Sequence, residues 1–246
     1  LISSSVGDDY YGTKVIEQLR TSGLAAGPQV QPGQETPLAV GVVDASGSRT
    51  YFQRREDHVV SSLAMPSVAQ LSGAEMLYVD WYDGPEILSA MERASSLMVP
   101  VFLNLESNYH DSPQLIELLR QTSICQVSLD EPGASGQATD IARSLIDRGV
   151  GTALVTMGAK GCAVARSGQA FSIQAPEVEV IDGYGAGAAF SAGVIYSILN
   201  EWPLDKAARV ATAYASLKCG VTGIADFPIE GVLRVAADLE MTASST

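Results

Sequence analysis

The chain of 246 residues carries 28 acidic and 15 basic side chains, a formal net charge of −13, and 46% of its residues are hydrophobic. A chain this apolar can bury enough surface to offset the entropy of folding, which excludes extensive disorder. The negative charge repels a phosphate backbone and argues against nucleic acid as the main ligand. No run approaches the roughly 20 apolar residues of a membrane span, and no signal-peptide pattern is present, so we expect no membrane partner.

The three cysteines, Cys125, Cys162 and Cys219, are odd in number and far apart. This favours reduced interior thiols over a disulfide framework and predicts a cytoplasmic protein. The two histidines, His58 and His110, offer no zinc-binding spacing. The motifs of a P-loop and of a nucleophile elbow are both absent from the sequence.

Hydrophobic periodicity first predicts a helix over 8–22 and then two strands, 38–43 and 50–53, joined as a hairpin around 44–48. A regular alternation follows, with strands at 76–80, 99–103, 124–127 and 152–156 and helices at 85–96, 113–121 and 137–147. Strands that alternate with helices predict a mostly parallel sheet covered on both faces. The right-handed crossover rule then favours a doubly wound α/β fold.

The pattern changes after Thr156. The expected elements are an antiparallel edge hairpin over 161–166 and 170–174, a strand at 177–181, and helices at 186–200, 204–218 and 230–239. Two of these helices follow each other with no strand between them. The sequence contains no internal repeat, so we expect one domain.

The segment from 180 to 190 is the most informative, because a predicted strand runs into the alternating glycines Gly183, Gly185 and Gly187 and then into an apolar helix. Such a turn presents backbone N–H groups at a helix N-terminus, where an anion such as phosphate is favoured. A tightly packed turn without a ligand is an equally open interpretation.

A dinucleotide site is a further alternative, since Gly183-x-Gly185-x-x-Ala188 satisfies the fingerprint Gly-x-Gly-x-x-Gly/Ala. That fingerprint requires a second strand, with an acidic residue at its end, after the helix. Here another helix is predicted instead, which disfavours a dinucleotide-binding oxidoreductase.

Four stretches together resemble the ribokinase-like (PfkB) carbohydrate kinases. The run Asp182–Phe190 is similar to the family's Asp-Thr-Thr-Gly-Ala-Gly-Asp-Ala-Phe signature, and Val155–Gly161 is similar to its glycine turn beside the nucleotide phosphates. Gly7–Gly12 resembles its early Gly-Asp-Asp-x-x-Gly stretch. Ala208–Gly220 is similar to the helix and loop that wall the adenine pocket, closest to ketohexokinase-type members.

The resemblance implies a single ribokinase-like domain over 1–246, with 36–55 as an inserted β-lid hairpin that can also form a homodimer. It implies Mg·ATP and a sugar-like small molecule as ligands. The residues it places at ATP are Thr156, Gly158, Lys160, Gly161, Lys218 and Gly220. The anion hole for the transferred phosphoryl group would be Gly185, Ala186 and Gly187.

Ala188 stands where the family signature has the aspartate that takes the proton from the sugar hydroxyl. Loss of a positioned general base costs about 10²- to 10⁴-fold in rate, so we expect an inactive or impaired kinase. Ala188 is either an engineered replacement or the mark of a natural pseudokinase that serves as a structural or regulatory subunit of an assembly. Gly183 and Tyr184, where the signature has Thr-Thr, favour natural divergence.

Further residues carry weaker predictions. The resemblance suggests Glu131, with Asp130 beside it, as carboxylates that act on Mg²⁺, although both could simply begin a solvated loop. Asn104 and Glu106 end a predicted parallel strand, at the edge where open α/β sheets bind ligands. Asp8 and Asp9 fit a helix start, and we favour that structural role over substrate binding.

The resemblance also implies a sugar-gripping strand upstream of Gly7, where this chain has only six residues and begins with Leu1 rather than methionine. Either a longer protein carries that segment or the protein lacks it. The identity of the sugar is therefore not specified by the sequence.

Overall fold

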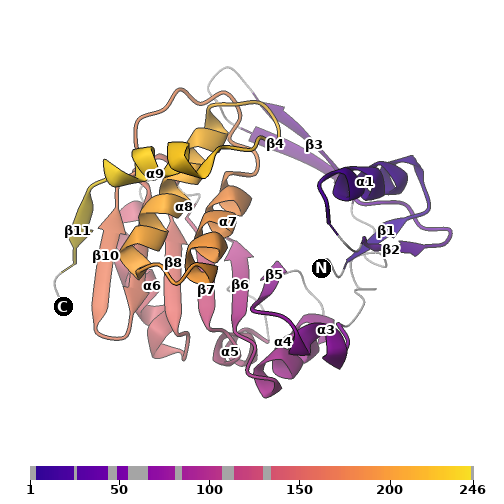
Figure 1. Cartoon of the computed structure of the whole chain (residues 1–246), viewed down its shortest axis with the longest axis horizontal. Helices are drawn as coiled ribbons and strands as arrows, with labels where there is room; N and C mark the ends of the chain where they lie inside the picture. Colours follow the sequence, from indigo (N-terminus) through magenta and orange to yellow (C-terminus); the bar gives the residue numbers. More distant parts are fainter. Residues whose placement is uncertain are drawn as a thin grey trace. The chain divides into compact units, whose positions relative to one another are not determined.

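The computed structural model describes residues 4–24, 27–43, 49–54, 66–80, 85–106, 114–129 and 134–244 (Figure 1). The chain forms two compact units, one of Leu1–Gly73 and Tyr82–Arg93 and the other of Ala74–Trp81 and Ala94–Thr246. The predicted hairpin turn at 44–48, both histidines, Asp130 and Glu131 lie outside the described residues.

The second unit is built on a seven-stranded sheet with the order β11-β10-β9-β8-β7-β6-β5 (Figure 1). Its strands are β5 (Leu77–Asp80), β6 (Val101–Glu106), β7 (Ile124–Ser128), β8 (Thr152–Thr156), β9 (Cys162–Arg166), β10 (Gln169–Ile173) and β11 (Met241–Ala243). β5 to β8 are parallel, and β9, β10 and β11 extend the sheet in antiparallel pairs. This is the mixed, mostly parallel α/β sheet that the alternation predicts.

Helices cover both faces of this sheet. α5 (Leu115–Arg120) and α6 (Ala138–Asp147) follow the parallel strands on one face, and α7 (Ala186–Leu199), α8 (Leu204–Cys219) and α9 (Ile229–Ala237) form the layer on the other (Figure 1). Strand order follows chain order, so the reversal typical of a doubly wound sheet does not occur within these seven strands. The second face is covered by the consecutive helices α7 and α8 instead.

Most predicted elements are confirmed to within about three residues at their ends. The strand predicted at 177–181 is wrong, because within the described chain this segment has no ladder partner. Its Val180 and Ile181 side chains are exposed, and only the N–H groups of Ile181 and Asp182 bond the chain opposite, at the carbonyl of Cys219. The segment 177–181 therefore has the β-branched pattern of a strand but does not pair with an edge of the described sheets.

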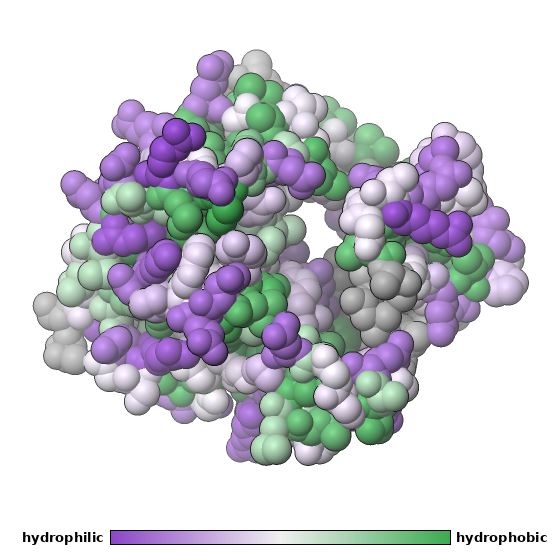
Figure 2. Space-filling view, in the orientation of Figure 1, coloured by the Kyte–Doolittle hydropathy of each residue, from purple (hydrophilic) through white to green (hydrophobic). Residues whose placement is uncertain are grey.

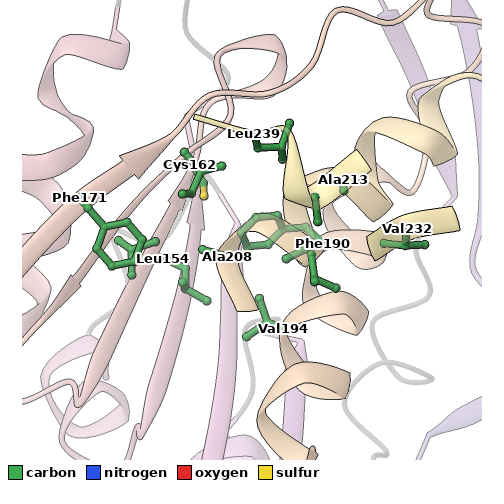
Figure 3. Close-up of a cluster of buried hydrophobic side chains, with 14 of the residues drawn as sticks. Leu154, Cys162, Phe171, Phe190, Val194, Ala208, Ala213, Val232 and Leu239 are labelled. Carbon is green, nitrogen blue, oxygen red and sulfur yellow. The ribbon is translucent and has the colours of Figure 1, made fainter. Parts of the chain in front are cut away.

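The core of the second unit lies between the sheet and the α7–α8–α9 layer. Figure 3 shows Leu154, Cys162 and Phe171 from the sheet side meeting Phe190 and Val194 of α7. α7 and α8 pack closely at a glycine, since a Cβ on Gly193 would lie 2.7 Å from the Cα of Ala211. The position and direction of α7 are thus fixed by backbone-to-backbone packing.

The first unit contains β1 (Ser5–Gly7), α1 (Tyr10–Thr21), β2 (Gln29–Gln31), β3 (Leu38–Val43), β4 (Arg49–Arg54), α3 (Val68–Ser72) and most of α4 (Pro85–Ser96). β1 and β2 form a small parallel pair, and β3 and β4 pair antiparallel as the predicted hairpin. The sequence patterns do not predict β1, β2 and α3, nor β11 of the second unit, and each of these elements has only three to five residues. Such short elements leave too few residues for a periodic signal.

Hydrophilic residues occupy much of the outer face of the helical layer of the second unit, with hydrophobic patches between them (Figure 2). Within the described ranges, no helix has the length and apolar character needed to cross a bilayer. Cys125 and Cys162 are buried, as the sequence predicts for interior thiols, and Cys219 is half-buried.

Candidate functional site

The glycine turn leads directly into the N-terminus of α7. Gly185 is the residue that precedes the helix, and its φ of 81° lies in the left-handed region that favours glycine. No side chain in the described part of the chain caps this helix end. The first N–H groups of a helix have no acceptor within the helix, so this start is suited to an anion. Gly187 and Ala188 are exposed there.

A row of polar side chains lies across the neighbouring parallel strands. Asp80, Asn104 and Gln126 are register partners on β5, β6 and β7, so their side chains point to the same face of the sheet. Asn104 is 5% exposed, and its amide donates to Asp80 at 3.0 Å. Gln126 is fully buried in the middle of the sheet. A polar row of this kind in an otherwise apolar sheet requires partners, and α7 supplies them.

Gln126 holds the first turn of α7 on the sheet. Its amide nitrogen donates to the carbonyl of Gly187 at 3.3 Å, and its amide oxygen accepts from the Ser191 hydroxyl at 2.8 Å. The Ser191 hydroxyl also lies 3.1 Å from the carbonyl of Gly187. Ala188 is three residues before Ser191, so it lies on the same side of the helix as this network. The polar row and the predicted anion turn are therefore one continuous structure.

Tyr78 completes this network at its outer end. Its hydroxyl donates to Asp80 at 2.6 Å, and its ring meets Phe102 edge to face. Burial, together with the negative charge of Asp80, raises the pKa of Tyr78 well above its ordinary value. The phenol stays protonated at neutral pH, and it orients the Asp80 carboxylate at the end of β5.

Asp182 joins the glycine turn to the loop that follows α8. Its carboxylate accepts the N–H of Tyr184 at 2.8 Å and the N–H of Gly223 at 2.9 Å. The Lys218 ammonium lies 3.2 Å from the same carboxylate and donates to the Asp182 carbonyl at 2.8 Å. The bond from Gly223, then those from Tyr184 and Lys218, lower the pKa of Asp182 to about 2. We call this set of contacts the Asp182 clamp.

The second predicted phosphate turn lies at the carboxyl end of β8. The hydroxyl of Thr156 lies 3.0 Å from that of Ser128, which ends β7. A short turn, Gly158–Lys160, follows, with Gly158 at a φ of 56°. Gly161 has a φ of 88°, and a Cβ there would collide with the carbonyl of Ile173. The close contact with Ile173 therefore requires a glycine at 161. At Gly158 a Cβ would have open space, so only the left-handed backbone favours glycine there.

The structure brings most of the predicted site residues to one edge of the second unit. Lys218 reaches the glycine turn, since its Cε lies 3.9 Å from where a Cβ on Gly185 would stand. Gly220 follows in the loop tied to Asp182. Glu106 is exposed at the end of β6 with a φ of 52°, and its N–H donates to Asn104 at 3.4 Å.

Two residues of this edge, Asp80 and Gln126, and the pairing of Asp182 with Lys218 are not predicted from the sequence. Asp80 has the same signal as Asn104, a polar residue that ends a parallel strand, and could have been found in the same way. Gln126 is a single polar residue inside a buried apolar strand, which is a detectable signal. The pairing of Asp182 with Lys218 spans 36 residues and has no local signal.

Comparison with known proteins identifies the family of this chain. The model of the pfkB family carbohydrate kinases matches residues 2–230, which is most of the chain. The chain belongs to the pfkB family of carbohydrate kinases. It is 28% identical over 185 residues to the ribokinase of Haemophilus influenzae and 30% identical over 220 residues to the fructoselysine 6-kinase of Shigella flexneri. These aligned residues are 72% and 86% of this chain.

The chain spans 57% of the Haemophilus ribokinase, 41% of the aminoimidazole riboside kinase of Salmonella typhimurium and 79% of the fructoselysine kinase. Among solved structures, the ribokinase of Arabidopsis thaliana in complex with ribose and ATP superposes with a TM-score of 0.79 at 20% identity. That superposition covers 95% of this chain and 80% of the Arabidopsis chain. A ribokinase-like structure from Escherichia coli that contains ATP and Mg²⁺ gives 0.76 at 18% identity, over 96% of this chain and 81% of that one. The pfkB fold of this chain is therefore confirmed.

Proposed function

We propose that this pfkB chain binds Mg·ATP with the terminal phosphates at the N-terminus of α7, and that its transfer of phosphate to a sugar hydroxyl is impaired by Ala188. The observation that carries the proposal is the uncapped start of α7 at Gly185, with Gly187 and Ala188 exposed beside it. Backbone donors here would hold a phosphate against the negative field of the whole chain.

The nucleotide would extend from this turn along the carboxyl edge of the sheet. Thr156 ends β8, and Gly158, Lys160 and Gly161 lie in the turn that follows, where backbone donors and an ammonium suit phosphate oxygens. Gly220 lies in the loop after α8, which we propose as the wall of the base pocket. The resemblance and the family membership support these assignments.

The divalent ion would neutralise charge on the phosphates. Glu131 and Asp130, which follow β7 in the sequence, are the carboxylates that we propose to act on it.

The polar row provides the groups for the sugar. Asp80 and Asn104 offer a carboxylate acceptor and an amide at the same edge as α7, and Glu106 adds a second carboxylate nearby. Hydroxyl groups of a carbohydrate donate well to such carboxylates. We propose the β3–β4 hairpin, within the segment 36–55, as the lid over this sugar.

Ala188 is where the reaction would fail. Its methyl group can neither accept the proton of a sugar hydroxyl nor orient that hydroxyl, whereas an aspartate at this position could do both. An ATP-consumption assay with ketoses should therefore detect weak turnover by the unmodified chain and about 10²- to 10⁴-fold faster turnover by Ala188→Asp. Ala188→Asn is the control, because it adds the same volume without a base. Robust turnover by the unmodified chain would refute the missing-base argument.

A non-catalytic role is the second candidate, supported by Ala188 and by Gly183-Tyr184 in place of the signature's Thr-Thr. In that case the chain would act as a structural or regulatory subunit. The β3–β4 hairpin has exposed Val40 and Phe52 side chains that could serve its contacts. Unchanged turnover in Ala188→Asp, measured on protein that binds ATP in calorimetry, would favour this role over an impaired kinase.

A further inference from the structure

Lys218 is one of the most buried charged residues in the described part of the second unit. The residue is 6% exposed, and it lies in the last turn of α8. A lysine buried to this extent requires acceptors for its ammonium, because an unpaired buried charge is strongly unfavourable. Its acceptors are both on Asp182: the backbone carbonyl at 2.8 Å and the carboxylate at 3.2 Å.

These two contacts fix the backbone and the side chain of the same residue. The Asp182 carboxylate then holds the N–H groups of Tyr184 and Gly223, and the backbone N–H of Asp182 bonds the carbonyl of Cys219. The turn ahead of α7 is therefore attached to the end of α8 through Asp182. Among the described residues that contact Asp182, Lys218 supplies the positive charge of this clamp.

The stem of Lys218 passes beside the glycine of the turn. Its Cε lies 3.9 Å from the position of a Cβ on Gly185, and this close approach is compatible with the left-handed backbone there. The end of the Lys218 side chain thus lies beside Gly185, while the hydrogen bond and the ion pair of its ammonium go to Asp182. A side chain in this position affects a bound phosphate by setting where the backbone donors point.

We propose that Lys218 is a positioning residue for the anion turn, acting through Asp182 rather than by direct contact with a phosphate. This inference rests on the proposed function only for the identity of the ligand, ATP. The effect of Lys218 on the structure of the turn without a ligand does not depend on that function. The Asp182 clamp would hold Gly185, Ala186 and Gly187 in one arrangement before any ligand binds, which reduces the ordering cost of binding.

Hydrogen exchange of the ligand-free protein tests this role directly. In Lys218→Met, the amide protons of Tyr184 and Gly223 should exchange about tenfold faster, the change expected for loss of a charge-assisted hydrogen bond from a clamp. Lys206→Met is the matched control. Lys206 lies on the same helix, but its ammonium lies over the Trp202 ring, 3.6 Å from the centroid, so exchange at Tyr184 and Gly223 should not change.

Calorimetry separates positioning of the turn from a general loss of structure. Lys218→Met should weaken ATP binding about tenfold and leave adenosine binding unchanged, because only the phosphates use the turn. Asp182→Asn keeps the shape of the side chain but removes the charge that pairs with Lys218, so it should also speed hydrogen exchange at the amides of Tyr184 and Gly223. It is the second variant to measure if Lys218→Met does not fold.

The outcomes are distinct. Unchanged exchange at Tyr184 and Gly223 in both variants would overturn the positioning role, and a loss of ATP affinity alongside it would assign Lys218 to direct phosphate contact. An unmodified chain that binds no ATP would contradict the proposed function. Faster exchange in Lys218→Met than in the unmodified chain would still support Lys218 as the residue that orders the turn.

Discussion

Each of the two units begins a helix beside a half-buried aspartate, and the two units use that aspartate differently. In the first unit Asp9 directly precedes α1, and its carboxylate accepts the N–H of Gly12 in the first turn at 2.8 Å. In the second unit Asp182 lies three residues before Gly185, and its carboxylate bonds Tyr184 and Gly223 instead. The start of α1 is capped by a side chain, and the start of α7 is not.

This difference distinguishes Asp9, whose carboxylate has a structural role at α1, from Asp182, which lies beside the candidate anion site at α7. Asp9 also accepts the N–H and the hydroxyl of Thr36, so its oxygens are committed to the fold, as the sequence predicts for a helix start. Asp182 shapes the turn but does not cap the helix. The N–H of Ala186 bonds the carbonyl of Gly183 at 3.4 Å, and the N–H groups of Gly187 and Ala188 remain for water or a ligand. A glycine at the capping position, with a structured turn in front of it, is therefore the informative combination.

The largest expected effect comes from giving α7 the kind of cap that α1 has. Gly185→Asp would place a carboxylate where it can accept the N–H of Gly187 or Ala188, and aspartate tolerates the left-handed backbone better than most residues. It would compete with the phosphates and repel them, so calorimetry should show ATP affinity reduced about a hundredfold or more.

Gly231→Asp is the control for that variant, because it adds the same charge to α9 at a position where the new Cβ meets no atom within 4 Å apart from its chain neighbours and its own helix backbone. ATP affinity should stay within about twofold of the unmodified chain. Equal ATP affinity in Gly185→Asp and the unmodified chain would place the phosphates elsewhere.

A smaller effect is expected from weakening the structural cap in the first unit. The Thr36 hydroxyl donates to Asp9 at 2.6 Å and accepts the buried N–H of Gly7 at 3.0 Å. Thr36→Val keeps the shape of the side chain but leaves that N–H without its acceptor, which should lower the free energy of unfolding by about 1–3 kcal/mol in urea titrations. Thr13→Val, at an exposed position of α1, should change it by less than about 0.5 kcal/mol. Equal losses in both variants would contradict the distinction.

The smallest expected effect is in acid. Hydrogen bonds, first from Thr36 for Asp9 and first from Gly223 for Asp182, lower both pKa values from 3.8 to about 2. A carboxyl whose pKa is lowered in the folded state stabilises the fold at a pH above its ordinary pKa of 3.8. This stability is lost as the pH falls towards 2. Melting temperatures should fall between about pH 4 and pH 2, and less steeply in Asp182→Asn. An unchanged slope in that variant would show that Asp182 does not contribute.

The sequence predicts the alternation of strands and helices because each long element has an apolar period and buries one face. It predicts the glycine turn because three glycines between a β-rich run and an apolar helix are typical of a tight turn. It misjudges 177–181, where Val178 and Val180 alternate like a strand but the chain finds no ladder partner within the described sheet. Local patterns describe a residue's preference and not its neighbours.

The connections within the site depend on neighbours for the same reason. Asn104 is found from its place at a strand end, but its contact with Asp80 follows from the register of β5 with β6. The bond from Gln126 to Gly187 joins residues 61 apart. Ala188 is noticed only through the family resemblance, since an alanine in a helix carries no physical signal of a missing base.

The most direct test of the account is an NMR titration of the unmodified protein with Mg·ATP, following backbone amide shifts. The uncapped start of α7 predicts the largest shifts at Gly187 and Ala188, with saturable binding. It predicts no shift at Gly12, whose N–H is already bonded to Asp9. Saturation by ATP without shifts at Gly187 and Ala188 would contradict the central claim that this helix start is the anion site.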